Sequence, residues 1–333
     1  MEYRILGKTG LRISRVGFGG IPIQRIDAEK SRTLLRAVAD SGINYIDTAK
    51  AYTVSEEYIG GAIEGMRDRF VLATKSGAKT ADAMRADIAD SLKKLRTDYI
   101  DLYQVHNPGP EQFAQVCAPG GALEALLEAK AAGKIGHIGL TSHSREVFER
   151  GLTLDWVETI MFPYNIVETQ GTDLIGKCAE ANIGFIAMKP MAGGALENAE
   201  LAMRFICANP AVSVVIPGMY APEEVAQNVR AAEQKLTDAD QTEIDEIRRT
   251  LGDQFCRRCN YCAPCTVGIS IPSVFLFEGY LSRYGLEEWA RQRYSTLSVK
   301  AGACIGCGAC EPRCPYQLPI REMMRKSAME FGM

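Results

Sequence analysis

Short apolar runs alternate with longer amphipathic segments along about the first 220 residues of the chain. This alternation is typical of βα units, in which buried parallel strands are covered by helices. Before the first unit, residues 3–14 predict a hairpin around the turn Gly7-Lys8-Thr9-Gly10. The apolar runs then predict eight strands, at Val16–Gly19, Tyr45–Asp47, Phe70–Lys75, Tyr99–His106, Ile135–Thr141, Thr159–Tyr164, Gly184–Lys189 and Ser213–Pro217.

The segments between these runs predict helices. In the first of them, Asp27 is a candidate N-cap and Gly42 a candidate stop. Apolar positions between these two residues recur on one helical face, at Leu34, Leu35 and Val38. A later helix, which ends before Gly133, is expected to bury Leu123, Leu126, Leu127 and Ala131.

Eight βα units predict an α/β fold of the (β/α)8 TIM-barrel type, because parallel strands need right-handed crossovers and eight of them can close on a side-chain core. A doubly wound open sheet is the alternative, but Gly17-Phe18-Gly19-Gly20 lacks the G-x-G-x-x-G spacing of a dinucleotide turn. Further helices are expected at Pro222–Ala232 and at about 238–251. The barrel domain, with its connecting helix, is therefore predicted to span residues 1–252.

The composition of the chain disfavours nucleic-acid binding and a membrane span but does not indicate a particular function. The chain has 333 residues, 47% of them hydrophobic, and a net charge of −3, so it has no electrostatic bias toward nucleic acid. The first residues lack a basic start followed by an apolar run, and no apolar stretch approaches about 18 residues. We therefore expect a cytoplasmic protein with no membrane span.

Eight of the eleven cysteines fall between Cys256 and Cys314, which predicts a second domain over residues 253–333. Thiolates three positions apart suit metal ligation better than a disulfide framework. Paired zinc sites and disulfides are the alternatives, but two triplets plus single cysteines fit cubane clusters better than two CxxC pairs do. The remaining cysteines are expected to be small buried hydrophobes, at Cys117, Cys178 and Cys207.

The tail resembles a two-cluster bacterial ferredoxin whose halves are separated by a helical insert. Its second motif has the C-x-x-C-x-x-C-x-x-x-C-P spacing, in which the fourth cysteine binds the other cluster. The first motif is a near copy with a shorter last gap. The resemblance implies two [4Fe-4S] clusters, one held by Cys256, Cys259, Cys262 and Cys314, and the other by Cys304, Cys307, Cys310 and Cys265.

Four polar residues follow or end three successive predicted strands, which would bring them to one mouth of the barrel: Asp47, Tyr52, Lys75 and His106. A tyrosine can act as a general acid toward a carbonyl oxygen when a nearby ammonium stabilises the phenolate. Asp47 would hold Lys75 charged, and His106 could orient the carbonyl. Taken singly, each residue favours a structural interpretation, with Asp47 as a cap, Tyr52 as a loop aromatic, Lys75 as a rim charge and His106 as a core imidazole, and it is their joint pattern that indicates a site.

The motifs around these residues resemble the aldo-keto reductase family over residues 1 to about 232. They are Tyr45-Ile-Asp47-Thr-Ala-Lys-Ala-Tyr52, Leu72-Ala-Thr-Lys75-Ser-Gly, Asp101-Leu-Tyr-Gln-Val-His106-Asn and Gly133-Lys-Ile-Gly-His-Ile-Gly139. The resemblance implies a barrel, an Asp–Tyr–Lys–His tetrad and reduction of aldehydes or ketones with NADPH, or less often NADH.

The same resemblance implies a nucleotide site, which several substitutions alter. Thr141 and Ser142 stand where the family usually has Ser-Asn, Met161 replaces a glutamine, and Met188, followed by Lys189, replaces the stacking aromatic. Glu224 stands near where an arginine is usual, which disfavours a 2′-phosphate. The implied cofactor-binding residues are Thr141, Ser142, Tyr164, Met188, Lys189, Pro217, Gly218 and Asn228.

Clusters transfer one electron at a time, whereas a nicotinamide transfers a hydride. The combination predicts an iron–sulfur oxidoreductase acting on a small carbonyl or alcohol, with electrons from NAD(P)H, a flavin, or a ferredoxin or flavodoxin carrier. The alternative is an electron-transfer or redox-sensing protein with a non-catalytic barrel. Two other histidines are expected to be structural, His137 as a buried or helix-packed residue and His143 at the rim.

Overall fold

The computed structural model describes residues 1–251, 256–258, 260–282, 285–314 and 316–332. They form two compact units. Unit 1 contains Met1–Asn165, Thr169–Pro190 and Asn198–Leu236, and unit 2 contains Ile166–Glu168, Met191–Glu197 and Thr237–Met333. Helix α10 (Asp238–Leu251) therefore groups with the cysteine-rich tail, although the sequence suggested that it belongs to the barrel; the boundary at residue 252 stays a prediction.

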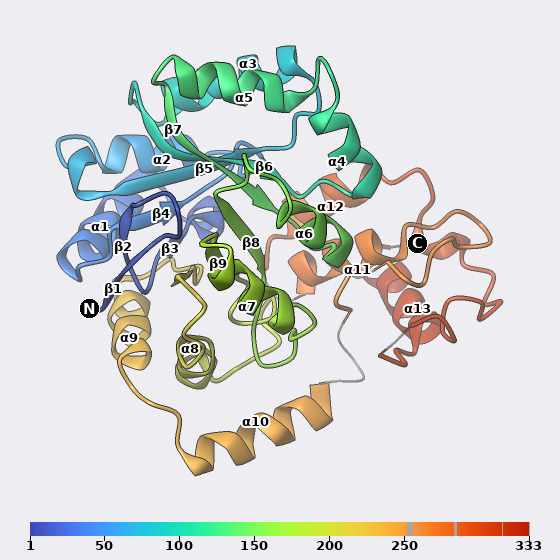
Figure 1. The fold of residues 1–333 in the computed structure, drawn as a ribbon. Coiled ribbons are helices and arrows are strands. Elements are labelled where there is room, and N and C mark those ends of the chain that lie inside the picture. Colours follow the sequence, from blue (N-terminus) through green and yellow to red (C-terminus); the bar gives the residue numbers. More distant parts are fainter. Residues whose placement is uncertain (252–255, 259, 283–284, 315, 333) are drawn as a thin grey trace. The chain divides into compact units, whose positions relative to one another are not determined.

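Unit 1 is built on an eight-stranded parallel sheet in sequential order from β3 to β10. Parallel bridges from Val16 to Val215 and from Gly19 to Gly218 join the first strand region to the last, so the sheet closes. The predicted TIM barrel is thus confirmed (Figure 1). Its strands are β3 (Phe18–Gly19), β4 (Tyr45–Asp47), β5 (Val71–Ser76), β6 (Ile100–His106), β7 (Ile135–Thr141), β8 (Thr159–Pro163), β9 (Gly184–Met188) and β10 (Val214–Val215).

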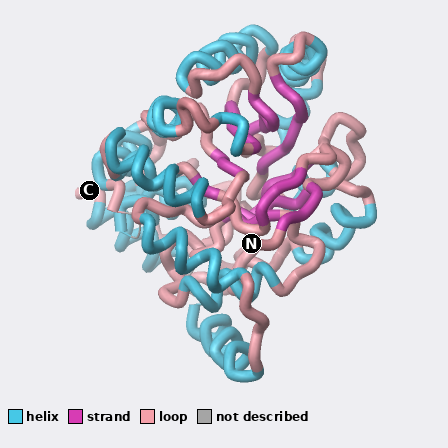
Figure 2. The backbone as a smooth tube through the Cα atoms, turned by 90° about the vertical axis from the view of Figure 1, so that its left-hand side faces the viewer, coloured by secondary structure: helices cyan, strands magenta, loops and turns pink. Residues whose placement is uncertain are grey.

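Helices cover the outside of this sheet, and in Figure 2 the strands of unit 1 lie inside a layer of helices. Buried aliphatic and aromatic side chains fill the space between the two layers. The predicted cap of α1 is present, since the Asp27 side chain accepts a hydrogen bond from the Lys30 N–H at 2.8 Å. The helices are α1 (Ala28–Asp40), α2 (Ser55–Ala62), α3 (Ala81–Lys94), α4 (Pro110–Cys117), α5 (Ala122–Ala131), α6 (Arg145–Gly151), α7 (Thr172–Glu180), α8 (Ala199–Cys207) and α9 (Pro222–Ala232).

The predicted hairpin, β1 (Tyr3–Ile5) with β2 (Arg12–Ser14), packs against the interior of the barrel. Leu6 and Ile13 are fully buried in a cluster with inward side chains of the strands, including Leu102 and Met161. Closing one end of the barrel with apolar side chains leaves the carboxyl ends of the strands as the open end.

The predicted face of α5 is partly wrong. Leu127 is 48% exposed and Ala131 is exposed as well, whereas the buried residues are Ala122, Ala125, Leu126 and Ala129. Positions three and four apart share a helical face, whereas adjacent positions such as Leu126 and Leu127 point about 100° apart. The small alanines, rather than the second leucine, therefore face the sheet.

His137 is half-buried in β7 and takes part in an ion-pair network. Its Nδ1 lies 2.7 Å from Glu158, whose other oxygen accepts from Lys130 at 2.6 Å and from the Ile138 N–H at 2.9 Å. Burial raises the pKa of Glu158, but these hydrogen bonds outweigh it and bring the pKa to about 2. The contacts favour the structural role that the sequence suggests for His137.

Unit 2 contains α10 (Asp238–Leu251), α11 (Ile271–Ser282), α12 (Glu287–Ser295) and α13 (Ile320–Glu330). Helices α11, α12 and α13 share a small core in which the Tyr294 and Phe331 rings stack with centroids 3.7 Å apart. Partly buried cysteines pack against this core, so the cysteine-rich segments are part of the same compact unit as the helices.

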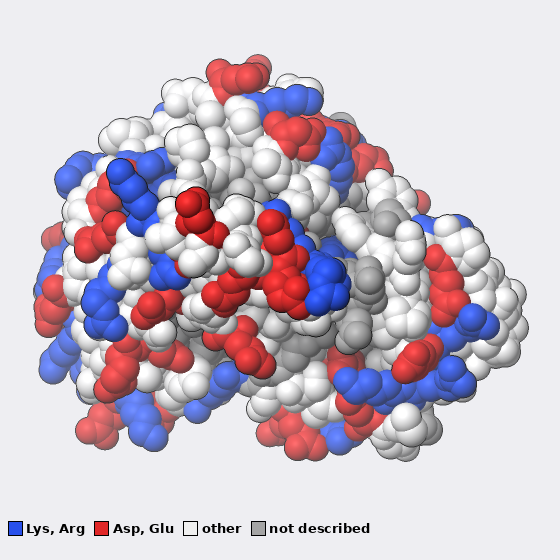
Figure 3. All heavy atoms as spheres, turned by 90° about the horizontal axis from the view of Figure 1, so that it is seen from below, with Lys and Arg blue, Asp and Glu red and all other residues white. Residues whose placement is uncertain are grey.

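The surface carries charges of both signs. On the face seen in Figure 3, Lys and Arg alternate with Asp and Glu, in keeping with a net charge of −3. Among the described residues, no helix combines the length and the apolar character that a membrane span requires.

Candidate active site

The tetrad residues come from the carboxyl ends of three neighbouring strands. Asp47 ends β4, Lys75 lies in β5 and His106 ends β6, while Tyr52 follows β4. Because β4, β5 and β6 pair in parallel, their ends meet at one edge of the barrel. The structure brings all four side chains together there.

Asp47 and Lys75 form a buried ion pair, each with about 2–3% of its side chain exposed. Lys75 Nζ donates to Asp47 Oδ1 and, at 2.7 Å, to the Thr48 carbonyl. Burial raises the pKa of Asp47 and lowers the pKa of Lys75, because each charge has lost water; their mutual attraction opposes both shifts. The pair therefore holds the Lys75 side chain against the Asp47 carboxylate at the mouth of the barrel.

Tyr52 and His106 lie beside this lysine. Lys75 Nζ is 4.9 Å from the centre of the Tyr52 ring. The rings of Tyr52 and His106 meet edge to face, with centroids 6.0 Å apart and an interplanar angle of 87°. Both side chains are only partly buried, so a small molecule could reach them.

Gln104 is a site residue that we did not anticipate from the sequence. It is fully buried, and its Nε2 donates to Asp47 Oδ2 at 3.0 Å. A usable signal was present in the chain, since residues two apart in a strand share a face and Gln104 precedes His106 by two.

Thr141 and Ser142 lie at the end of β7, one strand beyond His106. Thr141 Oγ1 accepts from the Asn107 N–H at 2.9 Å, and Ser142 Oγ accepts from the Ser144 N–H at 2.9 Å. Nδ1 of His143 lies 2.8 Å from Asn107 Oδ1, which fixes this rim residue against the loop after β6. The polar residues at the end of β7 are thus held by hydrogen bonds to the loops that follow β6 and β7.

Met188 and Lys189 lie at the end of β9, where the Lys189 carbonyl accepts from Asn165 Nδ2 at 2.8 Å. Tyr164 directly follows β8 and is buried. Its ring packs against Phe205 of α8, with centroids 5.4 Å apart.

Pro217, Gly218 and Asn228 lie after β10 and in α9. The Pro217 carbonyl accepts from the Gly19 N–H at 2.9 Å. A Cβ at Gly218 would lie 2.7 Å from Pro22 Cγ, so a larger side chain could not stand there without displacing that proline. Glu224 Oε2 accepts from the Tyr220 N–H at 2.8 Å and from the Ala221 N–H at 3.3 Å. A carboxylate therefore already uses donors at the start of α9 that could otherwise bind an anion.

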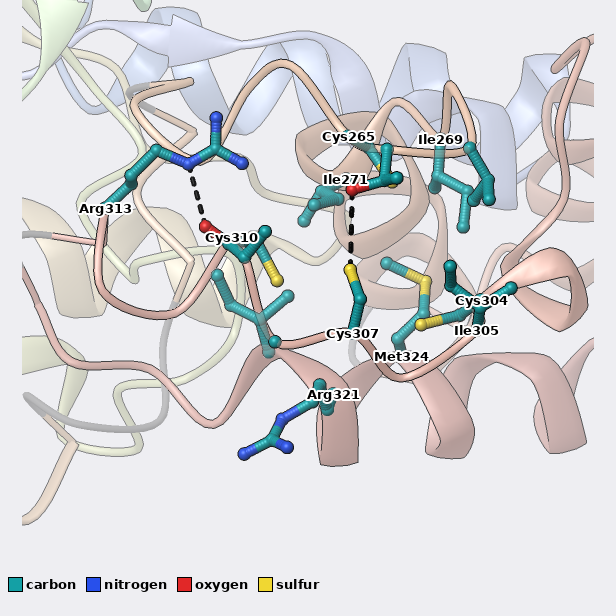
Figure 4. A pocket seen from close by; sticks show the side chains of 15 residues that line it. Cys265, Ile269, Ile271, Cys304, Ile305, Cys307, Cys310, Arg313, Arg321 and Met324 are labelled. Carbon is teal, nitrogen blue, oxygen red and sulfur yellow. Dashed lines mark hydrogen bonds between the residues drawn. The ribbon is translucent and has the colours of Figure 1, made fainter.

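Four of the predicted cluster ligands line one cavity in unit 2, which has about 400 Å³ of empty space, part of it open to solvent. They are Cys265, Cys304, Cys307 and Cys310, and Figure 4 shows their side chains on its walls. Thr266 Oγ1 lies 3.5 Å from Cys307 Sγ, and this contact, with the Ala309 N–H, lowers the pKa of Cys307. Stabilised thiolates are the form that binds iron, so these residues fit a cluster.

The remaining predicted ligands are described only in part, because Cys259 lies outside the described residues. Cys256 and Cys314 both lie within electrostatic range of the buried Arg257 guanidinium, which stacks over Tyr316 at 4.1 Å. Cys314 borders a different hollow from the four cysteines above. The described thiols are thus arranged around two places, although no group of three His, Cys, Asp or Glu side chains in the described residues is set to hold a single metal ion.

The isolated cysteines lie apart from these thiols. Burial raises the pKa of Cys178 to about 12, and it also raises the pKa of Cys207. Cys117, which we expected to be buried, is exposed at the end of α4. The prediction is therefore wrong for Cys117, because the last turn of that short helix reaches solvent.

Comparison with known proteins supports both halves. The aldo/keto reductase family model matches residues 15–200 and 196–249, and the 4Fe-4S dicluster domain model matches residues 255–319. The aldo-keto reductase YhdN of Bacillus subtilis is 37% identical over 201 residues, which are 55% of this chain and 59% of that protein.

Two solved structures have a similar fold. An aldo-keto reductase of Bacillus halodurans, in its holo form, is 27% identical with a TM-score of 0.67 and covers 74% of this chain and 96% of its own. An aldo-keto reductase of Klebsiella pneumoniae in complex with NADPH is 25% identical with a TM-score of 0.64, over 74% of this chain and 95% of its own. The chain therefore belongs to the aldo/keto reductase family of oxidoreductases, and it carries a 4Fe-4S dicluster domain.

Proposed function

We propose that the chain is an iron–sulfur oxidoreductase that reduces a small carbonyl compound, or oxidises the corresponding alcohol, with Tyr52 as general acid or base. The observation that carries this proposal is the buried Asp47–Lys75 pair, whose ammonium lies 4.9 Å from the Tyr52 ring centre. A nearby positive charge stabilises a phenolate and so makes the tyrosine proton easier to transfer.

The hydrogen bonds of Lys75 suggest a separate role for each residue of the tetrad. An ammonium has three N–H donors, and Lys75 directs one to Asp47 and one to the Thr48 carbonyl. The third is available for the Tyr52 side. Asp47 keeps Lys75 charged despite its burial, and His106, edge-on to the Tyr52 ring, is suited to orient a carbonyl oxygen by hydrogen bonding.

Residues at the strand ends and in α9 would hold a nicotinamide nucleotide or a flavin: Thr141, Ser142, Tyr164, Met188, Lys189, Pro217, Gly218 and Asn228. A bound nicotinamide would supply the hydride to the carbonyl carbon, while Tyr52 protonates the oxygen. Glu224 at the start of α9 disfavours a further negative charge there, so we expect NADH to bind better than NADPH.

The tail would hold two [4Fe-4S] clusters, one on Cys256, Cys259, Cys262 and Cys314 and the other on Cys304, Cys307, Cys310 and Cys265. The shared cavity of the second set supports this division. Such clusters supply single electrons, and a ferredoxin or flavodoxin is the matching class of external carrier.

A second candidate function is electron transfer or redox sensing with an idle barrel. The carboxylate of Glu224 at the start of α9 favours it, because it weakens an anion site. The buried Asp47–Lys75 pair argues against it, since burying a charged pair costs several kcal/mol per ion and an idle barrel has no need of it.

The direct test is turnover under anaerobic conditions. Protein with loaded clusters is mixed with 4-nitrobenzaldehyde and one electron donor, which is NADH, NADPH or a chemically reduced ferredoxin in three separate reactions. The alcohol formed in each reaction is measured by chromatography. We expect alcohol to form with at least one donor. No alcohol with any of them, from protein whose clusters are intact, would favour the idle barrel.

A further inference from the structure

We propose that Gln104 is a positioning residue for the reaction: it holds the Asp47 carboxylate in the orientation that keeps Lys75 charged beside Tyr52. This inference rests on the proposed function and deepens it. The Gln104 amide donates to Asp47, so its effect on proton transfer would pass through Asp47 and Lys75.

The contacts of Asp47 define the role. Its two oxygens are held by different donors, Oδ1 by Lys75 and Oδ2 by Gln104 at 3.0 Å. Two donors at separate oxygens fix the rotation of the carboxylate, which a single ion pair would leave free. Hydrogen bonding to the charged form also lowers the pKa of Asp47, although burial outweighs it and the net shift is upward.

The strand register explains why the Gln104 side chain can reach Asp47. Lys75 of β5 stands opposite Gln104 of β6, which stands opposite Gly139 of β7. A Cβ at Gly139 would lie 2.9 Å from Gln104 Cγ and would collide with Thr159 Oγ1, so the missing side chain leaves room for both residues. Gly139 thereby permits the glutamine to lie across the barrel toward Asp47.

Packing alone does not explain why a polar amide occupies this buried position. Gln104 is fully buried, and among the described residues no donor reaches its Oε1. An unsatisfied buried polar atom costs about 1–3 kcal/mol, so a leucine or methionine would be the cheaper filler at this position. The one bond that the amide makes is to Asp47, which points to the tetrad as the reason for its presence.

The test uses Gln104→Met, which keeps the length of the side chain and removes the amide. Without Gln104, Asp47 holds its charge less well, Lys75 is less fully protonated, and Tyr52 should ionise at a higher pH by about one unit. We expect kcat to fall by about 10²-fold through the lost orientation, with a smaller change in KM. Thr159→Val is the matched control, because it is equally buried in the same layer but does not touch Asp47.

Ionisation of Tyr52 is followed without substrate, as the ¹³Cζ chemical shift in protein labelled at its 13 tyrosines, with the signal assigned by its loss in Tyr52→Phe. A second variant, Gln104→Glu, puts a carboxyl against Asp47, and two adjacent carboxylates resist joint ionisation. Its kcat should therefore fall as the pH rises, because activity is retained only where one of the two carboxyls is protonated.

The outcomes separate the two levels of the proposal. An upward shift of Tyr52 ionisation in Gln104→Met but not in Thr159→Val supports the positioning role. If Gln104→Met only lowers the melting temperature and leaves both Tyr52 ionisation and the pH profile unchanged, the role is overturned. If Tyr52 ionises identically in wild type and Lys75→Met and no donor supports turnover, the proposed function itself fails.

Discussion

Replacement of Tyr52 by phenylalanine is expected to lower kcat for aldehyde reduction by about 10²- to 10⁴-fold while the clusters stay loaded. The hydroxyl is the group that would deliver a proton to the carbonyl oxygen, and phenylalanine removes it without changing the ring that faces His106. Substrate binding should change little, so the loss should appear in kcat rather than in KM.

Tyr99→Phe is the matched control for this variant. Tyr99 is 37% exposed and directly precedes β6, at the end of the strand opposite to His106. Its replacement should leave kcat within about twofold, as for other surface substitutions away from the site. Turnover by Tyr52→Phe equal to that of Tyr99→Phe would remove Tyr52 from the chemistry.

Replacement of Cys304 by alanine is expected to remove one cluster and leave the other. Four thiols line the cavity that contains Cys304, and alanine offers no ligand in its place. Iron and acid-labile sulfide should each fall from about eight to about four atoms per chain. The melting temperature should fall as well, because the cysteines pack against the small core of unit 2 and metal binding stabilises such domains.

Cys117→Ala is the corresponding control, since Cys117 is exposed on α4 and lies apart from the cysteine-rich segment. It should keep the full iron content. Undiminished iron in Cys304→Ala would instead mean that Cys304 is not a ligand, and complete loss of iron would mean that the two sets do not load independently.

The barrel could be predicted from the sequence because its strands are buried on both faces and read as continuous apolar runs. The same feature located the site, since Asp47, Lys75 and His106 end such runs. Leu127 could not be placed, because an amphipathic pattern does not fix the rotation of a helix when alanines can pack as closely as leucine.

Contacts between helices, strands and loops could not be predicted from the sequence. The hydrogen bond from Gln104 to Asp47 depends on the register of three strands, and the use of α9's first donors by Glu224 depends on a local turn. Likewise, spacing identified Cys265 as a candidate ligand, but only the fold of the tail brings it to the same cavity as Cys304 and Cys307.

Anaerobic titration of the purified protein with NADH, NADPH and FMN tests the central claim most directly, because it asks whether the barrel of an iron–sulfur protein binds a redox cofactor at all. Tight binding is measured by ultrafiltration while the visible absorbance reports on the clusters. We expect NADH to bind more tightly than NADPH, as Glu224 predicts. Protein that carries intact clusters yet binds none of the three would contradict a catalytic barrel, and tighter binding of NADPH than of NADH would contradict the role given to Glu224.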